Sequence, residues 1–210
     1  MVLTTEPHYE FNAGAACLNF VNTVWERVGY LTDTPAPPQE LLLAFSDLLA
    51  WAKAGDLLPA KTIRELDRIS ERDPAKSQRV FREALRLRET IFQTCLNLIL
   101  DRGNKAALLE PINKWVSDLP PEKLVYSNGK IVTAEFAEDP DLSTIQTTIC
   151  RDFMRLLCTQ DLSRLRVCAA DDCGWVFLDT SKSGRRKWCT MSDCGNRDKV
   201  NRFLERQRES

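Results

Sequence analysis

Four of the eight cysteines stand in two pairs near the C-terminal end, and their spacing constrains the fold more than any other feature. Cys168 and Cys173 have four residues between them, as do Cys189 and Cys194, and fifteen residues separate the two pairs. Each short loop can fold back on one ion, and the segment between them is long enough for one β-hairpin. Four thiolates complete the tetrahedral shell of zinc and leave no open position. The spacing therefore predicts one structural zinc ion.

Two disulfides, or an iron–sulfur centre, would use the same cysteines. The start of the chain has no basic segment typical of a signal peptide, and Asn19 and Asn22 interrupt the first apolar run, residues 15–24. We therefore expect no membrane span and a cytoplasmic location, where thiols stay reduced and bind metal more readily than they pair. The remaining cysteines stand in apolar helical contexts and are expected to be buried: Cys17, Cys95, Cys150 and Cys158.

The charge of the chain is unevenly distributed. Its 210 residues carry a formal net charge of −1, but residues 163–210 hold 11 Lys and Arg against 7 Asp and Glu, a net +4, which leaves −5 for residues 1–162. A basic C-terminal end favours a polyanion as partner, and DNA is the expected one. At 43% hydrophobic residues the chain can bury a real core, either one domain with a small module or two small domains.

The pattern of apolar residues upstream of the cysteines is mostly helical. It predicts a mainly α (α+β) fold in which residues 1–162 form a helical domain with one β-hairpin. The hairpin is indicated by alternating apolar and polar residues on either side of Asn128-Gly129. An Asn-Gly pair between two such segments is the strongest short signal for two paired strands. Expected helices span about 13–27, 38–54, 59–69, 73–101, 105–116 and 141–157, and the expected strands span 123–126 and 131–136.

Residues 163–210 are predicted to form a small treble-clef-like zinc finger. We expect a knuckle at Cys168 and Cys173, a hairpin that pairs residues 175–178 with 185–188, and a helix over about 196–208. The connection at residues 160–166 contains neither glycine nor proline, so the finger should dock closely on the helical domain instead of moving freely.

The same residues carry a family resemblance. The run Cys168-x4-Cys173-Gly-Trp-x-Phe, followed by Arg185-Arg-x-Trp-Cys189 and Cys194-Gly-Asn-Arg197, resembles the CGNR zinc finger of bacterial proteins. Upstream, Leu18-Asn-Phe-Val-Asn-Thr23 and two later segments resemble the ABATE domain, with Asn19 where that motif often has aspartate. The resemblance covers nearly the whole chain and implies a transcription regulator whose finger binds DNA.

Several basic residues of the finger are candidates for contacts with phosphates and base edges, because they lie on both the second expected strand and the helix. The alternative is a solvated face that balances the negative thiolates, and Arg197 in particular could brace the zinc shell or pair with Asp179. Trp175, Phe177 and Trp188 could stack on bases, but we predict that they form the finger's miniature core. The candidates for DNA binding are Arg185, Arg186, Lys187, Arg197, Lys199, Arg202 and Arg206.

No enzyme is predicted. The single histidine, His8, stands near the N-terminus, and the glycines form neither a dinucleotide-binding motif nor a phosphate-binding loop. The expected function is a DNA-binding transcriptional regulator whose helical domain senses a small-molecule effector or forms a homodimer. The alternative is a protein-interaction module in which the finger is purely structural.

Overall fold

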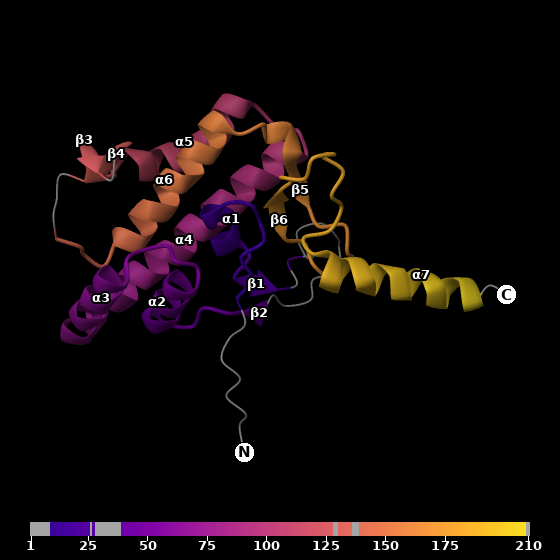
Figure 1. The fold of residues 1–210 in the computed structure, drawn as a ribbon, viewed down its shortest axis with the longest axis horizontal. Helices are drawn as coiled ribbons and strands as arrows, with labels where there is room; N and C mark the ends of the chain where they lie inside the picture. The colour runs from indigo at the N-terminus through magenta and orange to yellow at the C-terminus, as the bar shows by residue number, and fades with distance from the viewer. Residues whose placement is uncertain (1–8, 26, 28–38, 128–129, 136–138, 209–210) are drawn as a thin grey trace, which may run out of the picture.

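The computed structural model describes residues 9–25, 27, 39–127, 130–135 and 139–208, and the fold is mainly α-helical (Figure 1). The predicted fold class is confirmed: a helical body with short hairpins carries a cysteine cluster near the C-terminus. The helices are α1 Ala16–Val21, α2 Phe45–Ala54, α3 Ala60–Arg72, α4 Pro74–Ile99, α5 Lys105–Ser117, α6 Thr144–Thr159 and α7 Asn196–Arg208. The strands are β1 Val24–Trp25, β2 Gln39–Glu40, β3 Glu122–Ser127, β4 Lys130–Glu135, β5 Leu165–Val167 and β6 Val176–Leu178.

The short helix α1 lies at the centre of the molecule. Cys17, Leu18, Phe20 and Val21 are all fully buried, and α1 packs against α4, α6 and β6. A helix packed against several elements needs apolar residues over most of its circumference, and only Ala16 and Asn19 in α1 are half-buried. The core therefore runs continuously from the helical body into the finger.

The longest helix, α4, spans one side of the body and begins where the sequence predicts it. Asp73 Oδ1 accepts a hydrogen bond from the backbone N–H of Lys76 at 2.9 Å, and Pro74 occupies the first turn. An aspartate cap followed by proline satisfies an otherwise unpaired N–H group and favours helical backbone angles.

The first two helices are shorter than their patterns predict. The helix expected over 13–27 ends at Val21, because the chain turns at Asn22 and continues as β1, which pairs with β2. The helix expected from Pro38 begins only at Phe45, where the Asp47 carboxylate accepts hydrogen bonds from the N–H groups of Leu43 and Ala44 at 2.7 and 2.9 Å. Pro38 itself, like His8, lies outside the described residues.

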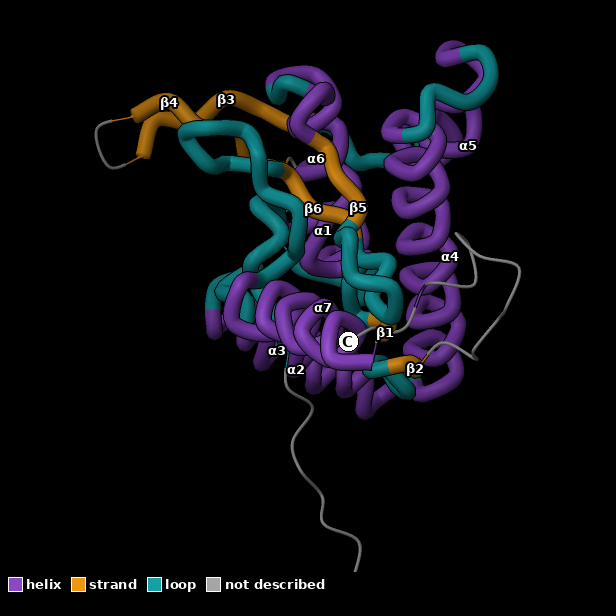
Figure 2. The backbone as a smooth tube through the Cα atoms, turned by 90° about the vertical axis from the view of Figure 1, so that its right-hand side faces the viewer, coloured by secondary structure: helices purple, strands orange, loops and turns teal. Residues whose placement is uncertain are grey.

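The predicted hairpin is present, since β3 and β4 pair antiparallel from Glu122–Glu135 to Ser127–Lys130. The Asn128-Gly129 turn lies outside the described residues. This hairpin lies at one end of the molecule, whereas α7 leaves the body at the other end (Figure 1), and α7 is seen nearly end-on in Figure 2. Within the described part of the chain, no helix is both long and apolar enough to cross a membrane.

Candidate metal centre and the basic surface around it

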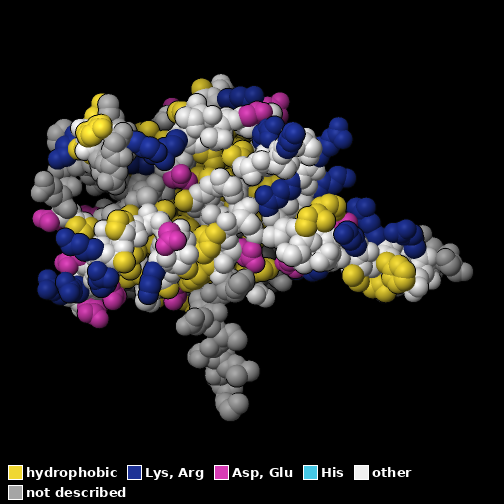
Figure 3. Space-filling model, in the orientation of Figure 1, with side chains coloured by type: hydrophobic (Ala, Val, Ile, Leu, Met, Phe, Trp, Pro, Cys, Tyr) yellow, Lys and Arg dark blue, Asp and Glu magenta, His cyan; other side chains and the backbone are white. Residues whose placement is uncertain are grey.

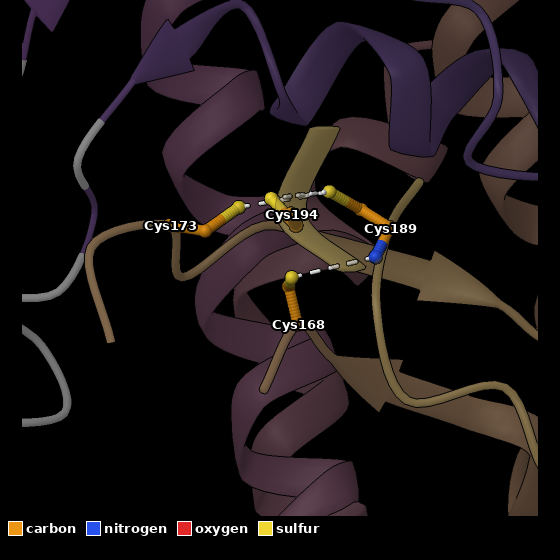
Figure 4. Close-up of side chains that lie close together, drawn as sticks. All are labelled: Cys168, Cys173, Cys189 and Cys194. Atoms are coloured by element: carbon orange, nitrogen blue, oxygen red, sulfur yellow. Dashed lines mark hydrogen bonds between the residues drawn. The ribbon is translucent and has the colours of Figure 1, made fainter. Parts of the chain in front are cut away.

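The four predicted cysteines converge on one point (Figure 4). Their sulfur atoms all lie within 4.8 Å of one another, and all four residues are buried. Cys189 Sγ lies 3.4 Å from Cys194 Sγ and 3.7 Å from Cys173 Sγ, while the backbone N–H of Cys189 donates to Cys168 Sγ at 3.4 Å. Four clustered thiols fit one structural zinc ion, as predicted.

Two structural elements supply these thiols in pairs. Cys168 follows β5 and Cys173 precedes β6, so one tight loop holds the first pair. In this loop Gly174 has a φ of +68°, and an added Cβ would lie 2.8 Å from the backbone carbonyl carbon of Arg27. Only glycine fits that approach without strain. Cys194 lies in the π-helical turn Met191–Gly195, which continues directly into α7.

The hydrogen bonds inside the cluster favour the charged form of one cysteine, Cys168. Hydrogen bonds from Cys173 and Cys189 lower the pKa of the Cys168 thiol well below its ordinary value. Hydrogen bonds with Cys168 raise the pKa of Cys173 and Cys189, and burial raises the pKa of Cys194. Because zinc binds thiolates and not thiols, a group that deprotonates readily assists metal binding.

The predicted strand pairing in the finger is wrong. β6 pairs with β5 and not with residues 185–188, and the register joins Leu165 to Leu178 and Val167 to Val176. The first cysteine pair already brings its two flanking strands together, and the Cys168 N–H extends the ladder to the Trp175 carbonyl at 2.7 Å. A turn does form between these two segments, at residues 181–184, with the Gly184 N–H donating to the Ser181 carbonyl at 3.2 Å.

Asp179 holds the segment that follows this turn. Its carboxylate is fully buried and accepts hydrogen bonds from the N–H groups of Ser181 at 2.9 Å and Arg186 at 2.8 Å. The Ser181 side chain, followed by these two N–H groups and the charge of Arg164, lowers the pKa of Asp179 to about 2. The carboxylate therefore remains charged at neutral pH and fixes residues 181–186 near the cysteines.

Arg186, a predicted DNA contact, points into the finger. Its guanidinium donates to the carbonyls of Trp188, Cys189 and Asn12, and it stacks over the ring of Phe177 at 4.5 Å. The side chain thus positions the loop that carries Cys189. The aromatic residues are also internal, as predicted, because Trp175 and Phe177 are buried and Trp188 packs against the core.

Arg197 lies against the metal centre. One terminal nitrogen is 3.2 Å from Cys194 Sγ and 3.1 Å from Asp172 Oδ1, and the other is 3.6 Å from Asp193 Oδ1. The expectation that Arg197 could brace the zinc shell agrees with this geometry. Its carboxylate partners are Asp172 and Asp193, and not Asp179.

The remaining candidates for DNA binding are exposed at the surface. Arg185 and Lys187 flank the inward-pointing Arg186, and Lys199, Arg202 and Arg206 lie on α7. Arg202 pairs with Asp198 one turn earlier, at 3.1 Å. Figure 3 shows Lys and Arg side chains along the projecting helix and on the adjacent part of the finger.

Sequence patterns gave no signal for the contacts that dock the finger. The Asn22 side chain donates to the Val176 carbonyl at 2.8 Å and accepts from the Val176 N–H at 3.1 Å. Its amide group thus makes the two hydrogen bonds that a neighbouring strand would make with β6. The Trp175 indole donates to the Val24 carbonyl at 2.7 Å, and the Arg27 N–H donates to the Cys173 carbonyl at 3.1 Å. These bonds confirm that the finger docks closely on the helical domain. Asn22 could have been found only as a polar residue inside an apolar run.

The four remaining cysteines differ in exposure. Cys17, Cys95 and Cys150 are buried as predicted, and burial raises the pKa of Cys95 to about 12 and that of Cys150 to about 11. The prediction for Cys158 is wrong, because it is exposed near the end of α6. The helical pattern places Cys158 beside apolar neighbours, but the last turn of α6 extends beyond the packed core.

Comparison with protein families gives two matches that together span most of the chain. Residues 14–160 match the ABATE model, described as "Putative stress-induced transcription regulator", and residues 164–207 match the model of the CGNR zinc finger. No curated protein matches the chain. Both families are of regulator or zinc-finger type and not enzyme families.

Proposed function

This chain belongs to the ABATE family and ends in a CGNR zinc finger, and we propose that it is a cytoplasmic, zinc-containing DNA-binding transcriptional regulator without enzymatic activity. In this proposal Cys168, Cys173, Cys189 and Cys194 hold one zinc ion that does no chemistry. Its task is to hold the finger in a shape that the few residues of the module could not maintain alone.

The observation that carries the proposal is the exposed basic surface of a finger whose first half is docked on the helical domain. Arg185 and Lys187 come from the loop beside the metal centre, and Lys199, Arg202 and Arg206 from α7. An α-helix fits the major groove of DNA, and α7 projects from the body (Figure 1). Arg186 and Arg197 take internal roles, so they are not among the proposed contacts.

Binding of the zinc-loaded protein to DNA at several salt concentrations tests the proposal. Each phosphate neutralised steepens the fall of log K with log salt by about 0.9, so Lys199→Ala together with Arg206→Ala should flatten the slope by about 1 to 2. Lys61→Ala with Arg79→Ala is a matched control, since both side chains are exposed on the helical domain, on α3 and α4. Arg202→Ala should cost about 1–3 kcal/mol at one base position if it reads guanine.

The competing function is a protein-interaction module with a purely structural finger. It is supported if the zinc-loaded protein shows no affinity for DNA at about 50 mM salt, where electrostatic attraction is strong. An equal effect of the Lys61 and Arg79 substitutions on the slope would also count against a specific basic surface.

For the helical domain we propose a small-molecule effector with an apolar body and a negative group. A groove of about 350 Å³ between α2 and α3 is lined by Leu49, Ala50 and Ile63, and its charged residues are Lys53, Arg64 and Asp67, a net charge of +1. Apolar walls with a few charged groups are typical of ligand sites. A metabolite that raises the melting temperature should lose this effect in Ala50→Trp, which fills the groove, and keep it in Ala75→Trp on the exposed surface of α4. If no metabolite stabilises the protein, a structural or dimerising role remains for this domain.

A further inference from the structure

Few packing contacts along helix α7 fix its direction relative to the body. Its apolar side chains are largely exposed, at 56% for Val200, 56% for Phe203 and 45% for Leu204. A helix of 13 residues that is not packed along its length is marginal in water. Its direction therefore depends on what holds its first turn.

That first turn is held by Arg197. The residue follows Cys194 by three positions, a spacing that puts two helical side chains on the same side, and its guanidinium lies 3.2 Å from the Cys194 sulfur. The same terminal nitrogen reaches Asp172, which directly precedes Cys173 in the other cysteine pair. One side chain thus joins α7, its own metal-binding thiol and the opposite half of the metal centre.

The strength of this link depends on the charge of the centre. Four thiolates on a zinc dication carry a net −2, and a guanidinium beside them gains both a charge-assisted hydrogen bond and a Coulombic attraction. Asp172 and Asp193 add to that attraction from two sides. Without the metal, no ion holds the two cysteine pairs at one point, so Cys194 and Asp172 are no longer fixed on either side of the guanidinium.

We propose that Arg197 is a positioning residue that makes the direction of α7 depend on zinc: the loaded centre clamps the helix through Arg197 and Asp172, and loss of the metal releases it. The inference rests on the proposed occupancy of the four cysteines by zinc, but it does not require DNA binding. Because α7 carries three of the proposed DNA contacts, the metal would then control how these contacts are presented as well as whether the finger folds.

Hydrogen exchange of the zinc-loaded, full-length protein tests the clamp. In Arg197→Gln the amides of α7 should exchange roughly tenfold faster, and a chelator should remove zinc roughly tenfold faster, as is usual when a residue that supports metal ligands is lost. Arg197→Lys keeps the charge and should recover part of both effects. Asp172→Asn removes the other end of the clamp and should accelerate exchange in α7 with a smaller effect on zinc release.

Arg202→Gln is the matched control, because Arg202 also pairs with an aspartate on α7 but does not contact a cysteine. It should leave zinc release unchanged and accelerate exchange of α7 less than Arg197→Gln. Zinc content is measured first, so a failure of the zinc assignment is seen separately. If Arg197→Gln retains zinc and exchanges in α7 no faster than Arg202→Gln, the clamp is wrong. Faster zinc release with unchanged exchange would also refute it, since Arg197 would then act on the metal alone.

Discussion

The two halves of the zinc finger are held in place in opposite ways. The first half, from β5 to β6, is built into the helical domain: Val176 and Phe177 are fully buried, and Asn22 binds both backbone groups of Val176. The second half ends in α7, whose apolar residues are about half exposed and which leaves the body (Figures 1 and 3). The contrast shows that the same metal centre can connect a fixed first half to a projecting helix.

The largest effect on stability is expected from a substitution at the metal centre, where the two halves of the finger meet. Cys189→Ser should lose zinc, and structural zinc contributes about 10–16 kcal/mol of apparent binding energy in isolated fingers. Because Trp175 and Phe177 share one core with the helices, the loss should also lower the melting temperature of the helical domain. Metal analysis and circular dichroism measure both effects. Cys158→Ser, an exposed cysteine outside the cluster, should change neither; zinc retained in full by Cys189→Ser would rule out the predicted centre.

A smaller effect is expected from the docking contact in the first half. Asn22→Ala leaves the buried N–H and carbonyl of Val176 without their partner, which should lower the free energy of unfolding by about 2–3 kcal/mol. Denaturant titration measures the change. Asn201→Ala, at an exposed position on α7, should cost less than about 0.5 kcal/mol. Equal losses in the two variants would remove the distinction between a fixed first half and a projecting helix.

The stability of the fixed first half of the finger is also expected to decrease at low pH. Arg27, whose N–H binds the Cys173 carbonyl, is buried and holds Glu89 with two hydrogen bonds of 2.8 and 3.0 Å. Burial alone would raise the pKa of Glu89, but the hydrogen bonds and charge of Arg27, together with Arg88, lower it below the ordinary value of 4.5. A lowered folded pKa means that the stabilisation is complete above about pH 4.5 and disappears as the pH falls through the folded pKa.

Glu89→Gln should therefore lower the free energy of unfolding at pH 7 by about 1 kcal/mol, a modest value because the carboxylate is 38% exposed. As the pH falls through the lowered pKa of Glu89, the variant and the original protein should converge. Denaturant titrations between pH 3 and 7 give both quantities. A constant difference across this range would show that Glu89 does not titrate as described, and Glu83→Gln, at an exposed pair on α4, supplies the comparison.

The smallest effect is expected on the projecting helix itself. Leu204→Gln should change the free energy of unfolding by less than about 0.5 kcal/mol, because its side chain is already 45% exposed. Phe177→Ala, an apolar truncation in the first half of the finger, should lower the free energy of unfolding by about 3–5 kcal/mol. Thermal unfolding of the two variants sharpens the comparison, and a large loss for Leu204→Gln would mean that α7 packs more tightly than its exposure indicates.

Local signals in the sequence determined a large part of this protein. The spacing of the two cysteine pairs predicted the metal centre, Asp73-Pro74 predicted the start of α4, and alternation around residues 128–129 predicted the β3–β4 hairpin. Each of these features is a property of neighbouring residues, because ligand loops, helix caps and tight turns are closed by groups a few positions apart.

Only the tertiary structure decided which partners distant segments choose. The first helix ends at Val21 because the side chain of Asn22 hydrogen-bonds the backbone of Val176 in β6, 154 positions further along the chain. Likewise, β6 pairs with β5 although residues 185–188 are slightly nearer to β6 in sequence. Arg186 points inward because it finds carbonyl acceptors and the Phe177 ring inside the finger. These pairings depend on how all buried polar groups of the chain compete for a limited set of hydrogen-bond partners. A local sequence pattern carries no information about partners that lie far away in the sequence.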